Sequence, residues 1–212
     1  MKAPLLVPVA LALVLGGCAR TGEIDATGGI TAIRSACPVV GVTAGTGDIT
    51  LFKTPGATDE NAIDVVANIT GVRSTCADAG PDIATTVNFN VEARRTDATG
   101  ARDLVLPYYI AIVRGGTNVV AKRIGRVNVH FDAGQARGQV AGEATTTIAR
   151  SAATLPAEVR DKLTHRRKAG DEDAAVDPLS QPDVRQAVAS ASFEALVGFQ
   201  LTEAQLKYNA TR

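Results

Sequence analysis

Two histidines and a pair of tyrosines are the residues of this chain whose types could support chemistry. His130 and His165 could each serve as a general base or as a metal ligand. His130 lies on the polar face of a predicted strand, so we expect its side chain to face solvent without a catalytic role. His165 opens the basic run 165–168. This run either ends a solvated helix, where the helix dipole favours cations, or binds a phosphate or an acidic partner.

The other chemical motifs are missing from the sequence. It contains no Gly-x-Ser-x-Gly, His-x-x-x-His or calcium-loop pattern. The glycines of 41–47 lack the Gly-Lys-Ser/Thr of a phosphate loop and precede a predicted strand, so they indicate a turn. Tyr108 and Tyr109 are adjacent in a predicted strand, so one should enter the core and the other should be exposed, where it could contact a ligand. We expect no catalytic residue, no metal ligand and no cofactor.

The first 18 residues hold the most specific motif. Lys2 precedes an uncharged apolar run that begins near Pro4 and closes with Leu15-Gly16-Gly17-Cys18. These features are typical of a secretory signal peptide, and the run is shorter than the roughly 20 residues that a membrane-spanning helix needs. A cysteine directly after two glycines, with leucine three positions upstream, resembles the lipobox of bacterial lipoproteins. An ordinary secreted protein with a chance cysteine at this position is the alternative.

The lipobox resemblance implies an address and a domain division. Residues 1–17 would be removed as a signal peptide, and Cys18 would carry the lipid. Ala19 stands where an aspartate often signals retention at the inner membrane, so we expect a lipid anchor in the outer membrane, with the protein on its periplasmic face. Residues 18–36 would form a lipidated, flexible tether, and 37–212 a single domain.

With Cys18 assigned to the lipid, two cysteines remain. Cys37 and Cys76 would then lie in an oxidising compartment, where such a pair most often forms a disulfide. Metal or redox chemistry is the alternative, but no histidine cluster accompanies these cysteines.

Composition adds few constraints on partners. The chain has 22 basic and 22 acidic residues, five Phe, three Tyr and no Trp. Without residues 1–17, which contain Lys2, the formal charge is 21 − 22 = −1. A nearly neutral chain gives no electrostatic reason to expect nucleic acid binding. The lack of tryptophan also disfavours an aromatic platform for carbohydrate.

Period-two alternation of apolar and polar residues dominates the chain after residue 37. It is clearest at 86–94 and also predicts strands at 61–72, 127–132 and 193–199. The β-prone segment 48–53, the more continuously apolar segment 104–113, which we expect to be central, and the segments 119–124 and 138–149, which follow turns, are predicted as further strands. Pro107 inside the 104–113 strand predicts a bulge or an edge position. These short strands predict a mainly β fold, an antiparallel β-sandwich that is immunoglobulin-like or fibronectin-like.

Helical signals are confined to the last third of the chain. We expect helices near 155–167 and 182–189, within a charged insertion at about 155–190. Thr202 and Gln205 have the spacing of a capping box and predict a terminal helix.

Two further segments, 106–111 and 197–209, resemble an uncharacterised group of envelope lipoproteins from Gram-negative bacteria. The resemblance covers most of the chain after residue 37 and implies no activity. The sequence therefore predicts a non-enzymatic envelope component that docks a protein partner. A periplasm-facing binding module for a small ligand or an envelope glycan is the alternative.

Overall fold

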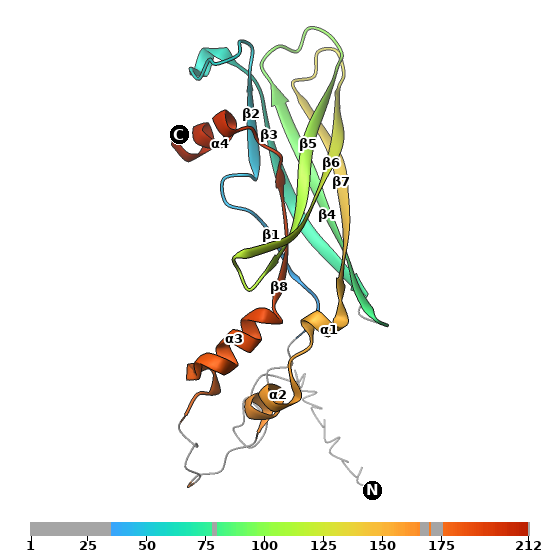
Figure 1. Cartoon of the computed structure of the whole chain (residues 1–212). Helices are drawn as coiled ribbons and strands as arrows, with labels where there is room; N and C mark the ends of the chain where they lie inside the picture. The colour runs from blue at the N-terminus through green and yellow to red at the C-terminus, as the bar shows by residue number, and fades with distance from the viewer. Residues whose placement is uncertain (1–34, 78–79, 166–169, 171–175, 212) are drawn as a thin grey trace, which may run out of the picture.

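The computed structural model describes residues 35–77, 80–165, 170 and 176–211, and its main body is two four-stranded sheets (Figure 1). One sheet has the order β1-β8-β5-β6 and the other has the order β2-β3-β4-β7. The strands are β1 (Val39–Val42), β2 (Asp48–Phe52), β3 (Ile63–Ala77), β4 (Asp82–Arg95), β5 (Arg102–Arg114), β6 (Asn118–Phe131), β7 (Arg137–Ala149) and β8 (Phe193–Phe199). The mainly β fold class is confirmed, whereas the immunoglobulin- or fibronectin-like arrangement stays a prediction.

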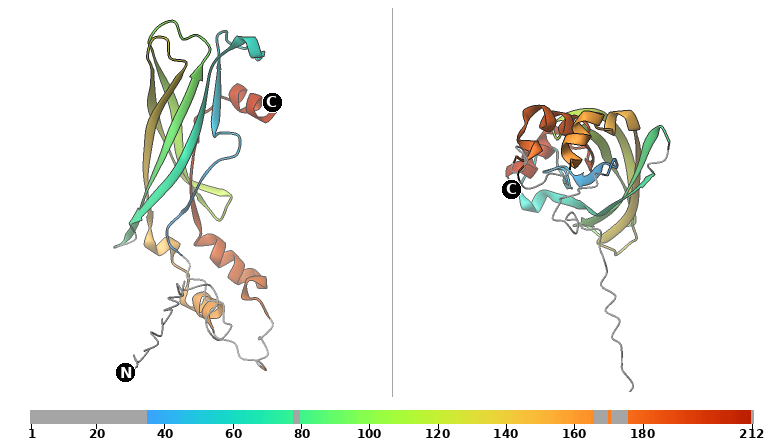
Figure 2. Two further views of the ribbon diagram at one scale, coloured as in Figure 1. Left: turned by 180° about the vertical axis from the view of Figure 1, so that it is seen from behind. Right: turned by 90° about the horizontal axis from the view of Figure 1, so that it is seen from below.

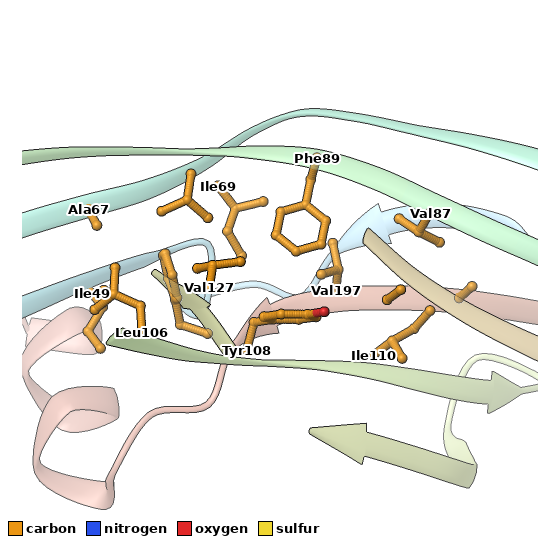
Figure 3. Packing of buried hydrophobic residues seen from close by; sticks show 14 of the residues in the cluster. Ile49, Ala67, Ile69, Val87, Phe89, Leu106, Tyr108, Ile110, Val127 and Val197 are labelled. Carbon is orange, nitrogen blue, oxygen red and sulfur yellow. The ribbon is translucent and has the colours of Figure 1, made fainter. Parts of the chain in front are cut away.

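One hydrophobic core lies between the two sheets, and the alternation of the strands supplies it. On β4, Val87, Phe89, Val91 and Ala93 are buried, as the period-two pattern predicts. Figure 3 shows Phe89 among residues of both sheets, including Val127 and Val197. Because the sequence has no tryptophan, aliphatic side chains make up most of this core.

The middle of the first sheet is β5, which pairs with β8 on one side and β6 on the other. The ladder with β8 ends at Tyr108, one residue after Pro107. The carbonyl of Pro107 faces the β8 side, where it accepts from the amide of Gln200 at 2.9 Å. In an antiparallel strand the N–H and C=O of one residue point to the same side. The missing N–H of Pro107 therefore removes no bond to β6. The predicted bulge or edge position is wrong: Pro107 lies in register in an inner strand, just beyond the end of the β8 ladder, and the register shift between β5 and β6 lies at Ile112/Val113.

The end of the two-sheet body that contains the β3–β4 connection also holds the disulfide and three helices. The sulfur atoms of Cys37 and Cys76 lie 2.08 Å apart, so the predicted disulfide is confirmed. Beside this end lie α1 (Arg150–Ala153), α2 (Ala157–Thr164) and α3 (Pro182–Ser190) (Figures 1 and 2). A 3₁₀ turn, η2 (Pro178–Ser180), precedes α3. We call this end the helical end.

The opposite end, which we call the loop end, is organised by Arg95. This side chain is only 3% exposed, and it donates to the main-chain oxygens of Gln135 at 2.9 Å, Asp132 at 2.9 Å and Ala98 at 3.3 Å. Its guanidinium also lies 5.0 Å from the ring centre of Phe131. A single buried cation therefore joins the β4–β5 and β6–β7 turns. The sequence prediction did not include this role of Arg95, although Arg95 lies on the same face of β4 as the buried residues Val91 and Ala93.

An ion pair joins the two sheets near the same end. Arg102 on β5 donates to both carboxylate oxygens of Asp64 on β3, at 2.8 and 2.7 Å. This fork holds the pKa of Asp64 below its usual range and raises that of Arg102.

Two further short elements follow β2 and β8 in the chain. The 3₁₀ turn η1 (Glu60–Ala62) precedes β3, and α4 (Glu203–Thr211) follows β8. The predicted capping box is confirmed: the amide of Thr202 donates to Gln205 Oε1 at 2.9 Å, and the amide of Gln205 donates to Thr202 Oγ1 at 3.3 Å. The ring of Tyr208 packs edge-on against Phe52, and this contact holds α4 against β2.

Candidate functional site

The strand β6 has two halves that differ sharply in burial. In its second half Val127, Val129 and Phe131 are buried and alternate with exposed residues. In its first half every residue from 118 to 124 is exposed. The exposed residues include three large aliphatic side chains, Val119 at 58%, Val120 at 48% and Ile124 at 61%. The alternation is lost because, among the described residues, the first half of β6 lacks the cover that the second half has on its inner face.

The first half of β6 is also an open sheet edge. Among the residues that the structure describes, β6 pairs with β5 alone. The oxygen of Val197 and the amide of Phe199 bond to Thr43 and Thr46, away from β5. Their β5 partners, Ile110 and Tyr108, therefore direct their own main-chain groups to β6.

The alternating direction of the main-chain groups along the strand identifies which groups of β6 are free. Gly125 pairs with Tyr108, and Arg123 pairs with Ile110, so Gly125 and Arg123 face β5. The intervening residue Ile124, and with it Lys122, turns its N–H and C=O to the unpaired side. We call residues 118–126 the β6 edge.

A hollow of about 200 Å³ lies between the β6 edge and β7. Its lining includes Tyr108, Ile110, Arg123, Ile124 and Glu143. The hollow is smaller than the 300–1,000 Å³ of most small-molecule sites. It marks the place where the two sheets diverge.

Tyr108 closes the inner side of this hollow. Its hydroxyl donates to the main-chain oxygen of Glu143 on β7 at 2.6 Å, and its ring packs edge-on against Phe89 (Figure 3). Burial raises the pKa of the Tyr108 hydroxyl, and the Glu143 carboxylate adds to this effect. Glycine is required at position 125, because a β-carbon there would lie 2.5 Å from Tyr108 Cζ.

The β7 side of the gap is a second free edge. The oxygen of Glu143 that accepts from Tyr108 points away from β4, the only described pairing partner of β7. Because Thr145 lies two residues after Glu143 in the same strand, it also directs its main-chain N–H and C=O toward the gap. Two unpaired strand edges thus face each other across the hollow, bridged by one tyrosine hydroxyl.

The charge of the β6 edge has one sign. Between positions 114 and 126 the chain carries Arg114, Lys122, Arg123 and Arg126 and no carboxylate. The last three are exposed and form no ion pair with a described carboxylate. Arg114 stacks over Phe193 at 5.8 Å and donates to the oxygen of Ser190. The open edge is therefore both cationic and partly apolar.

The prediction that one residue of the Tyr108–Tyr109 pair is exposed is wrong. Both are buried, at 9% and 8% exposure. Tyr109 faces outward from the sheet as expected, but the loop before β2 and the side chain of Lys122 cover its ring. Thr46 Oγ1 lies 3.1 Å from the Tyr109 hydroxyl, and Lys122 Nζ lies 4.4 Å from the ring centre. Neither tyrosine is free to form a ligand platform.

His130 is solvent-facing, as predicted, but it has acidic neighbours that the sequence prediction did not include. Its Nδ1 lies 2.9 Å from Asp103 and its Nε2 lies 3.3 Å from Asp132. Asn128 also donates to Asp103 at 3.2 Å. The Asp103 carboxylate raises the pKa of His130, and His130 lowers the pKa of Asp103. All of these side chains are open to water, so the group has a pH-dependent charge but no enclosed site for a substrate.

The other predicted site residues are separate from the β6 edge. His165 is exposed at the C-terminal end of α2, where its amide bonds to Asp161, and residues 166–168 of the basic run lie outside the described residues. Cys18 and the predicted signal peptide and tether up to residue 34 also lie outside them. Within the described ranges, no group of three or more His, Cys, Asp or Glu side chains is arranged so that it could hold a metal ion. Among the same residues, no helix combines the length and hydropathy of a membrane span.

Comparison of the chain with protein-family models, curated proteins and solved structures returned no match.

Proposed function

We propose that this chain is a non-enzymatic envelope protein that docks a protein partner through an open sheet edge. The observation that carries the proposal is the β6 edge, where unpaired main-chain groups lie among exposed Val119, Val120 and Ile124. Unpaired edges are templates for pairing with another chain, and exposed aliphatic residues beside them are typical of an interaction surface. The hollow beside this edge is smaller than usual ligand pockets, which favours docking over the binding of a small molecule.

The lipobox resemblance supplies the location in this proposal. A lipid on Cys18 would hold the protein at the outer membrane, facing the periplasm. The described chain begins at Ser35, 17 positions after Cys18 and two before the disulfide of the helical end. A flexible tether of this length spans about 20 Å. The helical end would then face the membrane, and the loop end would project from it.

Anchoring also explains how a modest docking surface can suffice. A module held at one membrane meets a partner in the same envelope at a raised effective concentration, so weak intrinsic affinity gives substantial occupancy.

The test is crosslinking in intact cells at native expression, followed by identification of the crosslinked proteins, with a Cys18→Ala variant as the matched control. We expect one envelope protein to be recovered repeatedly with the native chain. We expect the Cys18→Ala variant to appear in the soluble periplasmic fraction with reduced crosslinking. Recovery of the chain alone would contradict docking, and unchanged membrane retention of Cys18→Ala would contradict the lipid anchor.

A further inference from the structure

We propose that the β6 edge binds an extended acidic segment of its partner, which adds a strand to the β1-β8-β5-β6 sheet. This inference rests on the proposed docking function and names the chemistry of the occupant. It depends on three observations of the β6 edge: its free main-chain groups, its unbroken positive charge and the hollow beside it.

The free groups define the mode of binding. Lys122 and Ile124 present unpaired N–H and C=O groups at the two-residue spacing that an incoming strand matches. Strand addition of this kind takes its affinity from main-chain bonds and its specificity from alternate side chains. The segment 118–125 is long enough for an ordinary strand of five to six residues.

The charge defines the side chains of the occupant. On the outer face of the sheet the edge carries Lys122 and Arg126, and on the inner face it carries Arg123, beside the hollow. An incoming strand therefore meets cations on both of its faces. Glutamate or aspartate at alternate positions, which share one face of the incoming strand, complements Lys122 and Arg126 on the outer face, and the valine or isoleucine between the acids faces the hollow.

The same charge argues against a second copy of this chain as the occupant. Antiparallel pairing of two β6 edges centred on Ile124 would place Lys122 of each copy opposite Arg126 of the other, and like charges directly opposite each other are destabilising. Cations on an exposed edge also guard against edge-to-edge self-association. The charge of the β6 edge therefore disfavours pairing with a second copy of this chain and favours pairing with a strand of opposite charge.

The test uses the purified full-length chain, its disulfide intact, and synthetic eight-residue peptides. The probe peptide alternates glutamate with valine. One control alternates lysine with valine, and a second keeps the glutamates but has two central prolines, which cannot pair along a strand. Amide exchange is followed residue by residue by NMR. With the acidic peptide in excess we expect exchange at Lys122 and Ile124 to slow at least about tenfold, with no change for either control peptide.

Three variants locate the interaction. Charge reversal in Arg123→Glu/Arg126→Glu should weaken binding of the acidic peptide by about tenfold or more, because attraction becomes repulsion. The matched reversal Arg185→Glu/Lys207→Glu, at exposed positions on α3 and α4, should leave it unchanged. Ile124→Pro removes one free edge N–H while leaving the bonds to β5 in place, and it should also weaken binding.

Several results would overturn the inference. These are unchanged exchange at Lys122 and Ile124 with excess peptide, equal binding of the proline peptide, or equal affinity in the Arg123→Glu/Arg126→Glu variant. In any of these cases the only role left for the cations would be to prevent self-association through the β6 edge. A partner crosslinked in cells without peptide binding would keep the docking function and refute this site, whereas peptide binding without any cellular partner would do the reverse.

Discussion

Replacement of the buried residue Arg95 by alanine should destabilise the protein more than the replacement of any exposed arginine or lysine. Arg95 is almost fully buried and donates two bonds of 2.9 Å and one of 3.3 Å to main-chain oxygens of two turns. A hydrogen bond from a charged donor contributes about 1.5–3 kcal/mol, and the contact with the Phe131 ring adds about 0.5–2 kcal/mol. Part of this is regained when water reaches the freed carbonyls. We therefore expect a net loss of about 3–4 kcal/mol.

Urea unfolding followed by circular dichroism measures this loss, with Arg94→Ala as the matched control. Arg94 is exposed and lies on the opposite face of β4, so its replacement should change the free energy of unfolding by no more than about 0.5 kcal/mol. For a chain of this length the Arg95→Ala loss corresponds to a fall in Tm of about 10 °C. Arg95→Lys should be intermediate, because one ammonium group cannot reproduce the planar fork. An Arg95→Ala variant within about 1 kcal/mol of the Arg94→Ala control would refute the assigned role.

Three further predictions follow from the packing and charge of the described residues. The pKa of His130, measured by NMR titration, should lie above the usual 6.5 and should fall towards it in Asp103→Asn; the pairing then contributes stability below about pH 6.5 and loses it as the pH rises through the folded pKa. Gly142→Ala should cost about 1–3 kcal/mol in thermal or urea unfolding, because its β-carbon would lie 2.4 Å from the buried ring of Phe89. The control Gly100→Ala meets no atom within 4 Å, and an equal loss there would contradict the packing argument. Reduction of the disulfide, which joins residues separated by 39 positions, should lower the free energy of unfolding by about 3–4 kcal/mol; unchanged stability after reduction would contradict this estimate.

The alternation of apolar and polar residues predicted the core well in strands that have one buried face and one solvent-exposed face. The pattern at 127–132 placed Val127, Val129 and Phe131 inward and His130 outward, and the structure agrees. The predicted helix near 155–167 is shorter in the structure, because α2 begins at Ala157, after Pro156, and ends at Thr164. Strand order was not predictable: the parallel pairing of β1 with β8 joins segments more than 150 positions apart, and no local signal marks such a contact.

The features of the candidate site required tertiary information. Tyr109 is buried because a loop remote in sequence and Lys122 cover it, and strand parity cannot show such a cover. The β6 edge left a weak signal in the sequence, since four cations without a carboxylate occupy 114–126. Only the sheet order shows that this strand has an unpaired side. Arg95 occupies a position on the buried face of β4. A charged residue at such a position is the signal that could have identified its role.

The most direct test of the docking function and its site is photo-crosslinking in living cells from a single side chain on the β6 edge. A photoreactive residue at Ile124 samples the edge, and one at Asn88, exposed on the outer face of β4, serves as the control. We predict a defined adduct with another envelope protein from position 124 and none from position 88. The absence of an adduct at 124, an adduct only with a second copy of this chain, or equal adducts from both positions would contradict the account.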